Sequence, residues 1–168
     1  MLDVHDFNLR LVHEIKEQIT KDAERANEIF YLTPGVAKQI MGIQDIHTLA
    51  FGCGCLAKSK MDERDFRRTG LSDVPVSVHE LNFLFLNLVR DLAKTSRLQA
   101  MGMTSIDEIC YDLVASSTTS QLIKIASANN AIFEFAVPSV FLAKINMFSG
   151  DRSILAKHAA TLSRKIPA

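Results

Sequence analysis

The chain has 168 residues, and its 19 Lys and Arg residues balance 19 Asp and Glu residues, so it carries no formal net charge at pH 7. Hydrophobic residues make up 48% and charged residues 23%, a composition that supports a folded core and excludes a disordered chain. Three cysteines are too few for a disulfide framework. The sequence shows no signal peptide and no apolar run near the ~20 residues that a bilayer requires, so we expect a cytoplasmic protein without membrane contact.

Apolar residues at steps of three or four predict a long amphipathic helix over residues 3–30. Thr33 and Pro34 then provide an N-cap and a first-turn proline for a short second helix. A further helical turn begins near Ile46 and is expected to break at the Gly-Cys-Gly sequence of residues 52–54.

Three capping-box sequences, which begin at Ser77, Ser105 and Thr118, predict where later helices start. The expected helices span residues 78–101, 106–115 and 120–128. Residues 131–137 are rich in β-type side chains and are expected to be extended. The predicted fold class is therefore all-α.

The sequence resembles itself at a shift of 74 residues. Residues 5–9 (HDFNL) align with residues 79–83 (HELNF), and a shift of 76 relates later apolar positions. Because His and Asn positions agree as well as apolar ones, we interpret the pattern as an internal duplication, with chance helical periodicity as the alternative. The predicted organisation is a first helical repeat (3–60), a charged linker (61–76) and a second repeat with a basic tail (77–168).

The helix expected after Ser77 is apolar around nearly its whole circumference. In a soluble protein, such a helix is surrounded by other helices or buried in a subunit interface. We expect the two halves to pack as an internal pseudo-dimer, or two chains to form a homodimer. The dimer or partner interface is predicted to contain Phe7, Leu11, Ile15, Leu81, Phe85, Leu88 and Leu92.

The C-terminal region from residue 137 onward carries five bases and one acid. A helix over 140–145, a Gly-containing turn and a basic helix over 152–166 give the outline of a helix-turn-helix unit. In this interpretation Arg152 and Lys157 lie in or beside the major groove. The residues expected to contact phosphates are Lys144, Arg164 and Lys165. A solvated helix face is the alternative; the bases of residues 58–68 form either a solvated linker or a phosphate-contacting arm.

Two segments of the second half have a distinctive pattern: residues 80–83 (ELNF) and, above all, residues 121–129 (QLIKIASAN), which the aromatic residues 133–135 (FEF) follow. These segments resemble the FlhD family of flagellar transcriptional activators. The resemblance extends to the tail and adds His158 to the expected DNA-binding residues. It implies a mostly helical, dimeric protein that acts with a zinc-binding subunit, FlhC, which contributes much of the DNA contact. Residues 77–165 look like one complete copy of the family.

Little in the sequence favours catalysis or metal binding. Zinc sites use about four ligands, usually with a Cys-x₂₋₄-Cys spacing, so we interpret Cys53 and Cys55 as buried thiols. His5 and His79 have no accompanying nucleophile and are expected at an interface. Phosphate-binding glycine loops and hydrolase motifs do not occur in the sequence. We therefore expect no catalytic residue, no metal and no cofactor.

The expected function is that of a bacterial FlhD-like transcriptional regulator. It would bind promoter DNA, together with an FlhC-like or other regulator subunit. The alternative is a protein–protein adaptor or anti-activator on the same scaffold, without DNA contact. A helical enzyme is the third class, and a deep pocket with convergent polar groups would favour it.

Overall fold

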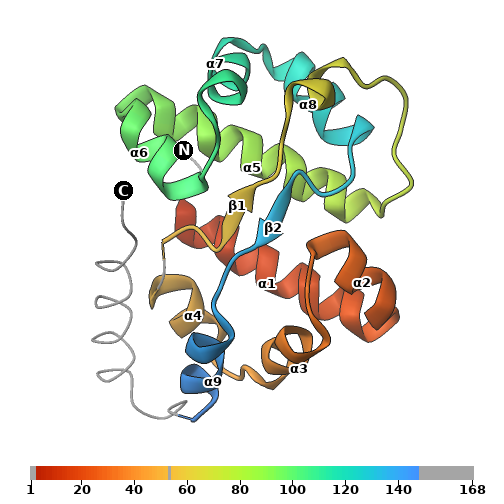
Figure 1. The fold of residues 1–168 in the computed structure, drawn as a ribbon, viewed down its shortest axis with the longest axis vertical. Helices are drawn as coiled ribbons and strands as arrows, with labels where there is room; N and C mark the ends of the chain where they lie inside the picture. Colours follow the sequence, from red (N-terminus) through yellow and green to blue (C-terminus); the bar gives the residue numbers. More distant parts are fainter. Residues whose placement is uncertain (1–2, 53, 148–168) are drawn as a thin grey trace.

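The computed structural model describes residues 3–52 and 54–147, and within these ranges the protein is mostly helical (Figure 1). The first half contains α1 (Val4–Lys21), α2 (Ala23–Phe30), α3 (Pro34–Gly42), α4 (Ile46–Gly52) and β1 (Ala57–Ser59). A 3₁₀ helix, η1 (Glu63–Arg67), precedes α5 (Val76–Thr95), α6 (Arg97–Thr104), α7 (Glu108–Ser116), α8 (Thr119–Ala128), β2 (Phe133–Phe135) and α9 (Ser139–Met147). The all-α prediction is confirmed, because the described strands form one small two-stranded sheet.

Helix starts that depend on a local cap agree well with the sequence. The Thr33 side chain accepts a hydrogen bond from the Val36 amide at the start of α3, as the Thr-Pro pair predicts. At α8 both halves of the capping box are present, because the Thr118 amide also donates to the Gln121 side chain. The predicted helix at Ile46 is confirmed as α4.

The two longest predicted helices are each wrong as single helices. Residues 3–30 divide into α1 and α2 at Asp22, and residues 78–101 divide at Ser96. Both residues are extended, with φ of −159° and −163°, and each side chain caps the following helix. The helical spacing of apolar residues continues across each break, so the pattern does not reveal it. A single polar side chain, which caps the next helix, marks where that helix begins.

Two of the three predicted capping boxes are wrong. Ser77 lies inside α5, which begins at Val76, and its hydroxyl donates to Glu14 Oε1 at 2.5 Å instead of capping the helix. Ser105 ends α6 in the left-handed conformation, with φ 54°. The cap of α7 is Asp107, whose carboxylate accepts from the Cys110 amide. A hydroxyl three residues before Glu is therefore insufficient where the chain has another acceptor nearby.

The core lies where α1 and α5 pack against each other behind the two strands in Figure 1. β1 and β2 pair antiparallel, with Ala57 opposite Phe135 and Ser59 opposite Phe133. Phe133 packs on Phe7 and Phe85, with ring centroids 6.0 and 5.3 Å away. The extended stretch expected at 131–137 contains β2; β1 was not predicted, because it is short and its sequence (AKS) has little β propensity.

Each strand leads into a segment that contacts the opposite half. After β1, η1 packs against α7 and α8; after β2, α9 packs against α3, where the Asn146 side chain donates to the Gln39 carbonyl at 2.9 Å. The expected helix at 140–145 is confirmed within α9. The second helix of the predicted helix-turn-helix unit, at 152–166, lies outside the described residues, as does Cys53.

Candidate functional surfaces

Each half contains a buried asparagine that binds the backbone of the segment leading into its strand. In the first half, Asn8 of α1 is fully buried and its amide donates to the carbonyls of Ala50 and Gly54, at 3.3 and 2.9 Å. Its oxygen accepts from the Leu56 amide at 2.9 Å. These bonds tie the chain between α4 and β1 to the centre of the molecule, and so they set where β1 lies.

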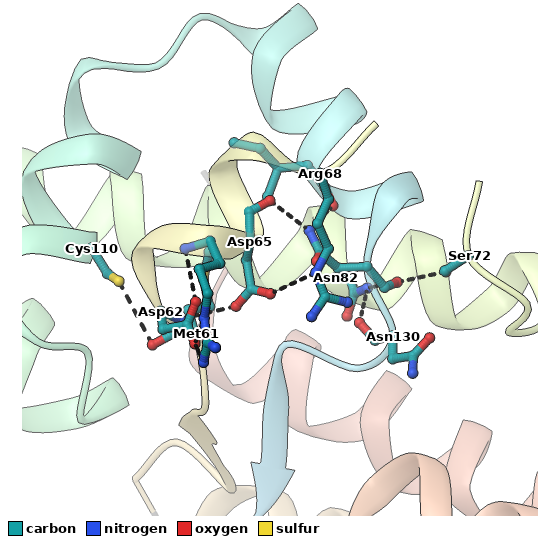
Figure 2. Close-up of polar contacts among 11 residues, drawn as sticks. Met61, Asp62, Asp65, Arg68, Ser72, Asn82, Cys110 and Asn130 are labelled. Carbon is teal, nitrogen blue, oxygen red and sulfur yellow. Dashed lines mark hydrogen bonds and ion pairs between the residues drawn. The ribbon is translucent and has the colours of Figure 1, made fainter. Parts of the chain in front are cut away.

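Asn82 of α5 makes the corresponding bonds in the second half. Its amide donates to the carbonyls of Ala126 and Asn130, at 3.0 and 2.8 Å, and to that of Asn129 at 3.3 Å. Its oxygen accepts from the Ile132 amide at 3.2 Å, just before β2. Figure 2 shows Asn82 beside Asn130. The two asparagines align in the sequence, but their hydrogen bonds were not predicted; an asparagine within an apolar helix face is the signal that could have indicated them.

The predicted interface residues lie on α1 and α5. Six of the seven are buried: Phe7, Leu11, Ile15, Leu81, Phe85 and Leu88. Leu92 is partly buried against the same core. Phe7 and Phe85 face each other across the two helices, with ring centroids 5.8 Å apart. Phe7 and Phe85 therefore join the two halves of one chain, and the six buried side chains are not exposed to a second molecule.

Of the predicted DNA-binding residues, the structure describes Lys144 alone. It lies near the end of α9 and is partly buried. The other predicted residues, Arg152, Lys157, His158, Arg164 and Lys165, lie outside the described residues.

The connecting segment after β1 carries exposed arginines whose charges are partly balanced locally. Arg64 pairs with Asp62 at 2.5 Å, and Arg68 lies 3.4 Å from Asp65. The Arg64 guanidinium lowers the pKa of the Asp62 carboxyl through a direct hydrogen bond. Such exposed pairs contribute little to stability. They do reduce the positive potential that a phosphate-contacting arm would need.

The same segment is attached to the second half by backbone contacts (Figure 2). The Cys110 thiol approaches the Met61 carbonyl at 3.6 Å, and the Asn129 amide donates to the Asp65 carbonyl at 3.0 Å. The Ser72 hydroxyl donates to the Asn129 carbonyl at 2.7 Å. Much of the region interpreted as a charged linker is thus an ordered cover over α7 and α8.

The thiols that the structure describes are poor metal ligands. Burial raises the pKa of Cys55 to about 12, and burial together with nearby Asp107 raises that of Cys110 to about 12, so both stay protonated at neutral pH. Across the described residues, no three His, Cys, Asp or Glu side chains form a group that could hold a metal ion.

A surface hollow beside α2 is open to solvent, and its lining includes Asp22, Glu24, Arg25, Glu28 and Asp73. Acidic side chains of this kind, open to solvent, provide neither an enclosed cavity nor a nucleophile with its base. None of the described helices combines the length and apolarity needed to cross a membrane.

Large apolar side chains are exposed on α6 and α7. Leu98 is 82% exposed and Ile109 is 55% exposed. Arg97 links these helices, with Glu108 at 2.7 Å, Asp112 at 3.3 Å and its guanidinium over the Tyr111 ring. This surface was not singled out by sequence reasoning, because exposure of one leucine on a short helix follows from tertiary packing alone.

The fold and these surfaces define a helical protein whose halves pair through a short antiparallel sheet. A family model described as flagellar transcriptional activator (FlhD) matches residues 61–165, more than half of the chain. The chain therefore belongs to the FlhD family, a family of transcriptional regulators and not of enzymes.

Curated relatives agree with this assignment. The flagellar transcriptional regulator FlhD of Nitrosomonas europaea is 30% identical over 100 residues, which cover 59% of this chain and 95% of the relative. FlhD of Nitrosomonas eutropha shows the same identity and coverage. FlhD of Cupriavidus pinatubonensis is 25% identical over 97 residues, covering 57% and 92% of the two chains. No solved structure matches the chain.

Proposed function

We propose that this protein is a transcriptional regulator that binds promoter DNA through its basic C-terminal tail, together with an FlhC-like or other regulator subunit. The observation that carries the proposal is the extent of the family match, which reaches residue 165 and therefore includes most of the tail. Residues 137–168 hold five bases and one acid in a chain of zero net charge. Phosphate contacts made by such bases release counterions and make binding depend steeply on salt.

In the same proposal, the two halves act as an internal pseudo-dimer, with 3–60 as a truncated copy and 77–168 as a complete one. The supporting observations are the matched hydrogen bonds of Asn8 and Asn82 and the pairing of β1 with β2. One polypeptide would then hold a single basic tail where a symmetric dimer of complete copies would hold two.

The experiment is a mobility-shift titration of the full chain, with and without the candidate partner subunit, over promoter fragments at increasing salt. The test variant is R152E/K157E, and the matched control is R64E/R67E, which changes charge equally on η1. We expect the tail variant to lose binding at least tenfold and the control to keep it. Equal binding by wild type and the tail variant would overturn DNA contact by the tail.

The second candidate function is a protein–protein adaptor or anti-activator, and exposed Leu98 and Ile109 favour it. An apolar surface framed by charged side chains suits contact with another protein. Here L98D/I109D is expected to abolish binding to the partner regulator in a pull-down, while R152E/K157E leaves it intact. The adaptor proposal fails if the wild type binds promoter DNA with the tail and shows no affinity for a regulator subunit.

A further inference from the structure

The ladder between β1 and β2 is symmetric in its backbone. Lys58 lies opposite Glu134 at its centre, and the bonds on either side are equivalent: Lys60 N donates to Ile132 O, and Ala136 N donates to Leu56 O, both at 2.9 Å. Exchanging the two strands would preserve every one of these bonds. The backbone alone therefore does not distinguish β1–β2 pairing from pairing of either strand with its own copy in a second molecule.

The size of the side chains does distinguish these pairings. Each small residue of β1 lies opposite an aromatic residue of β2: Ala57 opposite Phe135, and Ser59 opposite Phe133. Two copies of β1 would place Ala opposite Ser and leave a cavity above the helices. Two copies of β2 would place Phe opposite Phe and overfill the same space. Both a cavity and an overfilled space destabilise a packed core.

The helices beneath the strands show the same difference in side-chain size between the two halves. The first half contributes one ring to the buried aromatic cluster, that of Phe7 in α1. The second half contributes two rings, those of Phe85 in α5 and Phe133 in β2. At the shifts that relate the halves, Leu81, Leu11 and Ala57 stand at the corresponding positions. At these three positions, a second-half pair would place four aromatic rings and a first-half pair two, whereas the observed pair places three.

Charge favours the same choice. Lys58 is exposed and directly opposite Glu134, and Lys60 Nζ lies 3.3 Å from Glu134 Oε2. Pairing of β1 with itself would bring Lys58 opposite a second Lys58, and pairing of β2 with itself would bring two Glu134 carboxylates together. Like charges directly opposite each other destabilise an antiparallel pair.

We propose that this interface recognises a non-identical partner, namely the other half of the same chain, and rejects a second copy of either half. The three residues of β2 are aromatic, acidic and aromatic, and the three residues of β1 that pair with them are small, basic and small. The protein thereby closes on itself and does not form homodimers through these strands. The inference rests on the pseudo-dimer arrangement of the proposed function and not on DNA binding.

Cysteine cross-linking of the full chain tests partner choice. In a background with the three native cysteines replaced by alanine and a helical circular dichroism spectrum retained, we would compare K58C, E134C, K58C/E134C and the exposed control K124C on α8. Oxidation in dilute solution, followed by a non-reducing denaturing gel, shows which strands meet. Residues opposite each other in a ladder are close enough for a disulfide.

The double variant is expected to form an intramolecular cross-link and to migrate as a single chain. K58C and E134C are expected to form no more covalent dimer than K124C does. Covalent dimers of K58C or E134C well above that control would overturn the proposal. Loss of promoter binding, the failure of the proposed function, would leave this pattern of cross-links unchanged.

A charge exchange provides the second measurement. E134K places like charges opposite Lys58 and beside Lys60, and K58E/K60E places like charges around Glu134, whereas K58E/K60E/E134K restores opposite charges. We expect E134K and K58E/K60E each to lower the melting temperature and the fully exchanged variant to recover at least half of the summed loss. Losses that simply add in the fully exchanged variant would show that these charges do not select the partner.

Discussion

The two halves of this protein are built alike inside and differ at their contacts and surfaces. Asn8 and Asn82 bind backbone carbonyls in corresponding loops, and Tyr31 and Ser105 adopt the same left-handed conformation, with φ of 55° and 54°. Yet β1 carries small residues where β2 carries aromatic ones. The comparison teaches that the two halves share their polar bonds to the backbone, whereas the side chains at the contact between them differ in size and charge.

The outer surfaces differ as well. Glu24 of α2 belongs to an acidic hollow, whereas Leu98, which stands at the corresponding position of α6, is 82% exposed and apolar. A symmetric dimer presents the same surface twice. Among the described residues, the surface of α2 is therefore acidic where the surface of α6 exposes an apolar side chain, so a partner that recognises one of these two surfaces would not recognise the other.

The largest expected effect breaks the aromatic cluster. Phe85→Ala removes a fully buried ring and should lower the free energy of unfolding by about 4 kcal/mol, and Leu11→Ala, at the corresponding position, by about 3 kcal/mol. Urea unfolding followed by circular dichroism measures both. A loss below about 1 kcal/mol for Phe85→Ala would contradict the packing of α1 on α5.

The next prediction tests whether Asn8 and Asn82 contribute equally to the free energy of unfolding. Asn8→Ala and Asn82→Ala each leave buried backbone groups without a partner, and each should cost about 3 kcal/mol. The matched control is Asn87→Ala, whose amide bonds only within α5 and which should cost less than about 1 kcal/mol. Unequal losses, measured by the same unfolding experiment, would show that one half depends more on its asparagine.

A smaller effect concerns the breaks between paired helices. Asp22→Ala and Ser96→Ala remove the side chains that cap α2 and α6, and each should lower the free energy of unfolding by about 1 kcal/mol. Glycine at either position should cost only a few tenths of that amount. A loss confined to one half, seen by hydrogen exchange of α2 and α6, would show that the breaks are not equivalent.

The smallest expected effect belongs to a contact present in one half alone. Arg97→Ala removes the ion pairs between α6 and α7 and should cost about 0.5 kcal/mol, because the pair is exposed. The difference from wild type should shrink in high salt, as thermal unfolding would show. An effect that does not change with salt would indicate that packing on the Tyr111 ring dominates.

Much of the fold follows from local sequence. The Thr33 and Thr118 caps, the helix after Pro34 and the extended stretch around Phe133 were all predicted, because each depends on residues within one turn of the chain. The apolar faces of α1 and α5 likewise predicted which side chains would be buried.

The sequence by itself thus determined the helical class, most helix positions and many of the side chains that α1 and α5 bury. Tertiary structure decided the rest. The hydrogen bonds of Asn8 and Asn82, and the pairing of β1 with β2, join groups more than 40 residues apart in sequence. The helix breaks at Asp22 and Ser96 each depend on one capping side chain, and other residues nearby could have served equally well as caps. The pairing of β1 with β2 forms only once the two halves meet, because the cost of ordering so short a strand is offset by burial against the other half. The asparagine hydrogen bonds instead join segments far apart in sequence within each half.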